Sequence, residues 1–208
     1  MKLRVLLCGL ALFGTLTLGP NPARSDDKQK ADDKKQPGFD EYLKLAQPGP
    51  EHKRLDVLAG SWDATVKFWL EPGKPPTESS GGVIERKWIL GDRYLQEDVT
   101  GKMFGMPFRG LGLTGYDNMR KKYTGAWVDN MGTGIMHSLG DYDADKKTFR
   151  YVSDEIDPLT KKAKKVRSVI RILGNDKHVM EMYEPGPGGK EVRTFEMTCT
   201  RKKKSSAK

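Results

Sequence analysis

Two polar side chains near the middle of the chain are of the types that acid–base catalysis uses. Asp129 shares the parity of Trp127 in one run of alternating residues, and His137 shares the parity of Leu139 in the next run. If the apolar side of each run is buried in a sheet, both side chains point into the interior. A carboxylate and an imidazole that converge within hydrogen-bond reach there would form the acid–base pair of an isomerase or a hydrolase.

Both residues also have simpler explanations. An inward histidine is commonly a hydrogen-bonded core residue, and Asp129 with Asn130 would equally well end a strand and begin a turn. A buried Asp129 would need a partner, because an isolated buried charge is costly. Arg86 and Arg109 are the candidates for that partner. The sequence leaves these alternatives open.

Ligand binding is the second kind of chemistry that the residue types allow. Aromatic rings would provide apolar contact, and charged groups would orient one polar end of a ligand. The candidates for such an interior site are Arg109, Tyr116, Trp127, Asp129 and His137. Aromatic residues in strands are also common core residues. The inward rings therefore suit a filled interior as well as a hollow one.

A metal site is not predicted. The three histidines, His52, His137 and His178, show no metal-binding spacing, and the scarcity of cysteine argues against a structural zinc site. Cys8 lies in the apolar N-terminal run, which leaves Cys199 alone in the rest of the chain and excludes an intramolecular disulfide. Stability is therefore expected to come from the core.

The elements that would position these residues are strands. From Trp62 onward the apolar period is two, and turn signals separate ten short runs with no helical pattern between them. The runs are 62–70, 82–90, 93–103, 108–116, 123–130, 135–142, 148–156, 165–173, 178–184 and 191–201. Consecutive strands must then pair antiparallel, and such a meander removes its edges most simply by closing. We expect an all-β fold, a single antiparallel up-and-down barrel of about ten strands.

The stretch from Gly105 to Asn130 predicts the central hairpin of this barrel, with its turn at Asp117-Asn118. Glycines at positions 110, 112 and 115 leave part of the first strand without side chains. This pattern predicts a sharply curved strand, or room for something to lie against the backbone.

The two ends of the chain have different compositions from the middle. Residues 1–25 combine a basic start, a short apolar run and small residues before a cleavage site, which predicts a secretory signal peptide. Residues 26–47 form a charged flexible leader that ends in a short amphipathic helix from Phe39 to Gln47. Residues 48–203 form the barrel, and residues 204–208 a basic tail. We expect an exported protein of the periplasm or cell surface with no transmembrane segment.

The formal charge of +9 does not indicate a nucleic-acid partner. Eight of the positive charges lie in residues 1–25 and 201–208, so the remaining body is near +1. Basic residues at a chain end are commonly solvated. No basic stripe carries the interleaved aromatics that single-stranded nucleic acid requires. The oligomeric state is not indicated by the sequence.

The segment Leu58-Ala59-Gly60-Ser61-Trp62 resembles the Gly-x-Trp start of the calycins, the lipocalins and fatty-acid-binding proteins. In those barrels a basic residue of the last strand packs across the Trp ring, which implies a barrel-closing pair of Trp62 and Arg201 here. The blocks PGPEHKRLDVLAGSW, ILGDRYLQE, GMPFRGLGLTGYDN, YTGAWVDNMGTG and MYEPGPGGKE are similar to an exported bacterial family known only as a domain of unknown function. That resemblance covers residues 48–203 and implies a calycin-like barrel.

A barrel of about ten strands is wide enough to hold a ligand, and by analogy with the fold we expect a small, largely apolar molecule inside it and no cofactor. Haem is the one cofactor to consider, since related ten-stranded barrels bind it through a histidine near the chain end, where this sequence has none after His178. Two alternatives to a carrier remain. One is a barrel enzyme that uses Asp129 and His137, and the other is an envelope interaction module whose barrel is filled.

Overall fold

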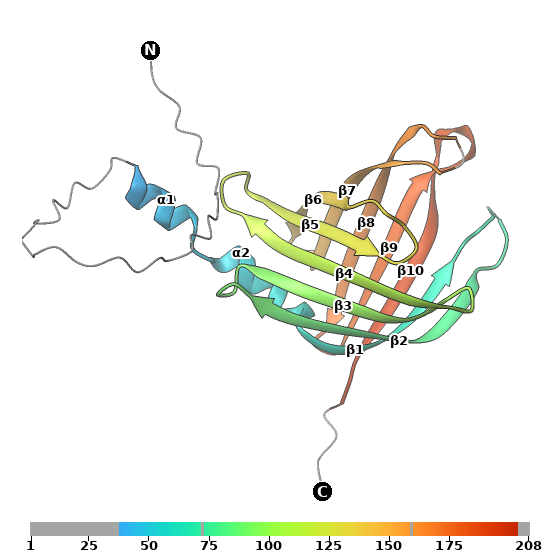
Figure 1. Cartoon of the computed structure of the whole chain (residues 1–208), viewed down its shortest axis with the longest axis horizontal. Helices are drawn as coiled ribbons and strands as arrows, with labels where there is room; N and C mark the ends of the chain where they lie inside the picture. The colour runs from blue at the N-terminus through green and yellow to red at the C-terminus, as the bar shows by residue number, and fades with distance from the viewer. Residues whose placement is uncertain (1–37, 72, 159, 204–208) are drawn as a thin grey trace, which may run out of the picture. The chain divides into compact units, whose positions relative to one another are not determined.

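The computed structural model describes residues 38–71, 73–158 and 160–203, and it confirms the predicted barrel. Ten antiparallel strands follow one another around a closed ring, with β1 paired to both β2 and β10 (Figure 1). Their bounds are β1 Gly60–Phe68, β2 Thr77–Ile89, β3 Tyr94–Met103, β4 Met106–Asp117, β5 Lys122–Asp129, β6 Met136–Asp143, β7 Thr148–Ile156, β8 Ala163–Gly174, β9 Lys177–Pro185 and β10 Glu191–Arg201. The predicted signal peptide, most of the leader and the tail lie outside the described residues.

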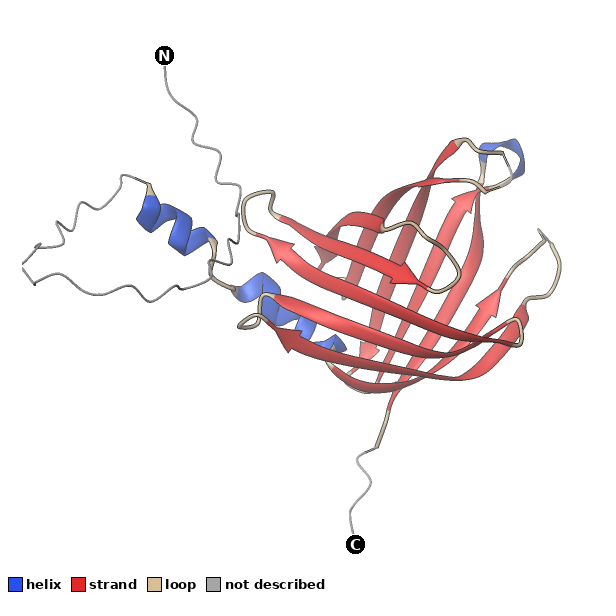
Figure 2. Cartoon of the chain, in the orientation of Figure 1, coloured by secondary structure: helices blue, strands red, loops and turns tan. Residues whose placement is uncertain are grey.

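The helices lie before β1, apart from one short turn (Figure 2). They are α1 Phe39–Leu45, α2 Pro50–Lys53, the 3₁₀ helix η1 Arg54–Leu58, and η2 Pro187–Gly189 between β9 and β10. The predicted amphipathic helix is α1, but it buries no residue. Asn118 in the β4–β5 turn donates hydrogen bonds to the carbonyls of Leu45 and Gln47, at 2.8 Å each, and so fixes the end of this segment. Within the described residues, no helix is long and apolar enough to cross a membrane.

The segment α2–η1 closes one end of the barrel, and we call it the plug. Leu55 and Leu58 are buried among side chains from β3, β5 and β7, which form the closed-end core. Tyr123 donates its hydroxyl to the backbone carbonyl and the side chain of Glu51, at 3.0 and 2.9 Å. His52 is buried, and its ring meets Tyr116 edge-on at 5.9 Å. The plug is therefore held by both apolar burial and hydrogen bonds.

Trp62 and Arg201 join the first and last strands at the same end. They are cross-strand partners, and the Arg201 guanidinium lies over the Trp62 ring, 4.0 Å from its centroid. Arg201 also donates to the carbonyls of Ala59 and Val57, at 2.7 and 3.0 Å. The contact that the resemblance implied is thus present, and the planar guanidinium adds a fork of hydrogen bonds to the helical plug.

The hairpin β4–β5 shows why its glycines are needed. Its turn is held by Asp117, whose Oδ1 accepts from the backbone N–H of Met119 and Arg120 at 2.8 and 2.9 Å. The ring of Trp127 lies against the inner side of β4, because a Cβ placed at Gly110 or Gly112 would lie 2.3 or 3.2 Å from its atoms. The predicted room beside the backbone exists, and this indole fills it.

The wall formed by β4 to β7 reverses the usual polarity of a barrel. Many of its inward positions toward the middle of the barrel are small or polar: Gly110, Gly112, Thr114, Gly125, Ser138, Gly140 and Ser153. Several of its outward positions are apolar and exposed: Leu111, Leu113, Val128, Leu139 and Val152. An inner face that lines a space, rather than a packed core, is not required to be the more hydrophobic one. The apolar pattern therefore does not identify the inner face here.

Candidate functional site

The barrel is hollow toward the end opposite the plug. A cavity of about 770 Å³ opens between the ends of β1, β3, β5 and β7. Most of its lining is apolar: Val66, Phe68, Val99, Phe108, Trp127, Met180, Met182, Phe195 and Met197 are among the residues. A volume in this range, lined by aromatic and aliphatic side chains, is typical of sites for small organic ligands. Methionines add an adaptable surface.

Acidic side chains lie near the mouth of this cavity, with Asp129, Asp154 and Glu155 among its lining residues. Asp129 Oδ2 accepts from the indole N–H of Trp127 at 2.8 Å, and its Oδ1 accepts from the backbone N–H of Met131 at 2.9 Å. The carboxylate is therefore held by its own strand and the following loop. Neither Arg86 nor Arg109, the partners considered from the sequence, binds it.

A buried ion pair crosses the inner wall deeper in the barrel. Nε of Arg86 binds the carboxylate of Glu97, and Nη1 of the same guanidinium lies 3.1 Å from Nε2 of His178. Burial, with the charges of Arg86 and Arg201, lowers the pKa of His178 to about 3, so this ring is neutral. Neutral His178 accepts the guanidinium N–H at Nε2 and packs edge-on against Trp62, 4.4 Å between centroids. The wall is polar there but carries no net charge.

A smaller space of about 100 Å³ adjoins the cavity on the side of the plug. The two share Glu97, Trp127, Met136 and Met180 among their lining residues. Five hydroxyl side chains line the smaller space, and we call it the hydroxyl niche: Thr114, Ser138, Tyr151, Ser153 and Ser168. The lumen therefore has an apolar outer part and a hydroxyl-rich inner part.

The residues predicted to bind a ligand do not all meet in the lumen. Trp127 and Asp129 line the cavity. Tyr116 points inward but packs with the closed-end core, next to Tyr123. Arg109 is on the outer face, where its side chain is 67% exposed and pairs with Asp98. His137 is also exposed, between Met136 and Ser138, which line the lumen.

The orientation predicted for His137 is wrong, and the reversed wall explains why. The sequence suggested that Leu139 and its parity mates face the core, yet Leu139 is exposed on the outside. Asp129 and His137 therefore lie on opposite faces of the sheet. They do not form the convergent pair that the enzyme hypothesis requires.

Sequence reasoning considered Arg86 only as a partner for Asp129, and it missed the Arg86–Glu97 pair and the serines of the lumen. Glu97 lies on the same face of β3 as Leu95 and Val99. Arg86 likewise lies on the same face of β2 as Ile84 and Trp88. A charged residue in the apolar phase of a strand was the available signal in both cases. The serines of the niche gave no comparable signal, because serine is common on outer strand faces.

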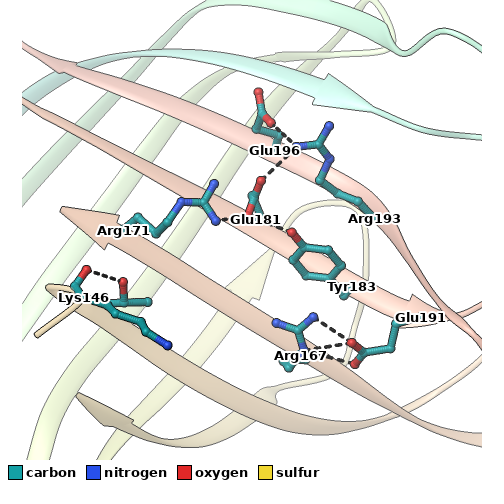
Figure 3. Close-up of polar contacts among 9 residues, drawn as sticks. Lys146, Arg167, Arg171, Glu181, Tyr183, Glu191, Arg193 and Glu196 are labelled. Atoms are coloured by element: carbon teal, nitrogen blue, oxygen red, sulfur yellow. Dashed lines mark hydrogen bonds and ion pairs between the residues drawn. The ribbon is translucent and has the colours of Figure 1, made fainter. Parts of the chain in front are cut away.

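A second polar cluster lies on the outer side of β8, β9 and β10 (Figure 3). Glu181, whose side chain is 4% exposed, binds Arg171, Tyr183 and Arg193. The hydrogen bond from Arg171, with further ones from Tyr183 and Arg193, holds the pKa of Glu181 at about 2. Arg193 also stacks on Trp69, 4.1 Å from the ring centroid. Every charge in the cluster has a partner, which indicates a structural role.

The described residues do not suit a histidine-ligated haem. None of the side chains that line the cavity is a histidine, and the Nε2 of His178 is already bonded to Arg86. Nor do three or more His, Cys, Asp or Glu side chains of the described part of the chain gather where they could hold a metal ion. The chemistry that the lumen offers is apolar contact and hydrogen bonding.

Comparisons with known proteins identify a family and a fold. Residues 47–201 match the family model described as a protein of unknown function, DUF1579. The crystal structure of Rv2717c from M. tuberculosis is similar with a TM-score of 0.51 at 16% identity, covering 76% of this chain and 100% of that chain. A redesigned β-barrel gives a TM-score of 0.37 at 13% identity, covering 72% and 96%. No curated protein sequence matches the chain. The likeness to Rv2717c shows a calycin-like ten-stranded barrel and nothing about a ligand.

Proposed function

The chain belongs to the DUF1579 family of proteins of unknown function, and from that premise we propose that it binds a small, largely apolar molecule inside its barrel. The observation that carries the proposal is the cavity of about 770 Å³ with its lining of aromatic, aliphatic and methionine side chains. An interior packed to the density of a protein core leaves no space of this size. The filled-barrel alternative is therefore not favoured.

The experiment uses the neutral fluorophore N-phenyl-1-naphthylamine, which emits strongly only in apolar surroundings. We expect saturable binding at one site per chain. The variant Val66→Trp, which places an indole in the cavity, should weaken binding at least tenfold, because the added volume competes with the probe. Val152→Trp adds the same ring to the exposed outer face of β7 and should bind as the wild type does.

Two further results decide the proposal. Native mass spectrometry of protein purified from its own host should show a stoichiometric small molecule that denaturation releases. A wild-type protein that takes up neither the fluorophore nor any host molecule would overturn the proposal. Equal binding by Val66→Trp and the wild type would place the fluorophore outside the cavity and also count against it.

Export belongs to the same proposal. The N-terminal pattern of residues 1–25 predicts cleavage after Ser25. The intact mass of the protein isolated from its host should therefore lack these residues, and the protein should be released with the periplasmic or secreted fraction. A full-length mass in the cytoplasmic fraction would contradict this part of the proposal without affecting the ligand test.

A further inference from the structure

The hydroxyl niche contains a buried donor without a partner. Tyr151 is only 6% exposed, and its Oη makes no hydrogen bond within the described structure. Burial raises the pKa of this phenol, so it keeps its proton and remains a donor. A buried hydroxyl without a partner costs free energy relative to one that is hydrogen-bonded. Tyr151 belongs to the closed-end core and also lines the niche, so an acceptor that reaches its hydroxyl from the niche would relieve this cost.

The backbone places other hydroxyls beside this one. Tyr151 and Ser168 are cross-strand partners on β7 and β8, and Ser138 and Ser153 are partners on β6 and β7. Side chains of partners on one face lie about 5 Å apart at Cβ. Ser153 donates its own proton to Glu155 at 2.9 Å, which leaves its oxygen as an acceptor. The niche thus offers both a donor and an acceptor.

The charges of the neighbouring wall cancel. Arg86 is paired with Glu97, and the histidine that faces Arg86 is neutral. A carboxylate entering the niche would lose its hydration and find no free cation, because Arg86 is already paired with Glu97. A hydroxyl or amide group, by contrast, can accept from Tyr151 and donate to Ser153.

We propose that the ligand is a neutral amphiphile that enters with its polar end first, so that a hydroxyl or amide group is hydrogen-bonded in the hydroxyl niche and its apolar body fills the cavity toward the mouth. This inference rests on the proposed function and adds the class of ligand and its direction. The 100 Å³ of the niche fits a small polar group. The apolar lining of the larger cavity fits a hydrocarbon chain or ring system.

The test measures displacement of N-phenyl-1-naphthylamine by 1-decanol and by decanoate. Tyr151→Phe should weaken 1-decanol about fivefold to tenfold, as expected for one lost hydrogen bond, and leave the fluorophore within twofold of wild type. Comparing each ligand across variants cancels the intrinsic difference in water solubility between the two ligands. The matched control is Tyr94→Phe, which removes a phenol from the outer face of β3.

Folding of the variant can be checked separately. Because Tyr151 Oη has no partner, Tyr151→Phe should keep or slightly raise the Tm of the ligand-free protein. A second variant, Glu97→Gln, removes the charge that balances Arg86. The ratio of decanoate affinity to 1-decanol affinity should then be at least tenfold higher for Glu97→Gln than for the wild type.

The outcomes separate this inference from the proposed function. If the fluorophore binds the wild type but Tyr151→Phe changes neither 1-decanol nor decanoate, the end-first orientation is overturned while lumen binding stands. Unchanged ligand preference in a folded Glu97→Gln variant would overturn the role of charge balance. If the fluorophore itself does not bind, the proposed function fails first.

Discussion

The ring of Trp127 occupies the space above Gly110, so closely that a Cβ on this glycine would lie 2.3 Å from the ring carbon Cζ2. The two residues are on neighbouring strands, β4 and β5, and Trp127 also lines the cavity. A glycine on one strand therefore sets the position of an aromatic wall on the next. The same contact fixes the indole N–H where Asp129 accepts it.

The first prediction concerns this contact. Gly110→Ala should destabilise the protein by about 1 to 3 kcal/mol, because the new methyl group forces the indole away from β4. Chemical denaturation measures the loss, and the intrinsic fluorescence of the folded protein should shift as the indole moves. Gly134→Ala is the control, since a Cβ there meets nothing within 4 Å. Equal stability of the two variants would contradict the steric role of Gly110.

The second prediction concerns Arg201. Arg201→Lys should cost about 2 kcal/mol, although it keeps the positive charge over Trp62, because a lysine cannot donate simultaneously to Ala59, Val57 and Asn175 as the guanidinium does. Urea denaturation at pH 7 provides the measurement. Arg109→Lys on the outer face should change stability by less than about 0.5 kcal/mol. A loss no larger for Arg201→Lys would mean that the charge over the ring, and not the fork, secures the plug.

The third prediction concerns the stability of the barrel in acid. The pKa of Glu181 is about 2 in the folded protein and near 4.5 when unfolded. A lowered folded pKa contributes stability above pH 4.5 that is lost as the pH falls toward 2. The contribution should be about 2 kcal/mol, after allowance for screening of the partly exposed arginines.

Glu181→Gln should therefore be less stable than the wild type at pH 7, and the difference should shrink between pH 4.5 and pH 2. Unfolding free energies across this range are the readout. Asp154→Asn, which removes a carboxylate whose side chain is 78% exposed, is the control and should change little at any pH. A constant difference between wild type and Glu181→Gln would show that the cluster does not titrate as described.

The fold could be predicted from sequence because local and long-range signals agreed. Turn residues such as Asp117 and Asn118 lie between runs of period two, and only a closed antiparallel ring leaves no edge for so many strands. The pairing of Trp62 with Arg201 was accessible through resemblance. None of these features depends on which side of the β4–β7 wall faces the lumen.

The candidate site was harder to predict for a physical reason. Hydrophobic alternation identifies the buried face of a sheet only when burial means packing, and β4 to β7 line a space with glycines and hydroxyls instead. His137 was therefore assigned to the wrong face, while Tyr151 and Ser153 drew no attention. Trp127 and Asp129 were assigned to the inner face because they share the parity of Tyr123, and these aromatic residues of β5 do face inward.

The hydrogen bond from Arg201 to Ala59 joins residues 142 positions apart in the sequence, and this has a consequence for the order of folding. Hairpins from β2 to β9 form between neighbours, but the ring and its plug are complete only when the last strand arrives. Closing so long a loop is entropically costly and characteristically slow. Closure of the ring should thus be a late step of folding that completes all ten strands together. Removing β10 should leave a collapsed species with exposed strand edges rather than a smaller barrel.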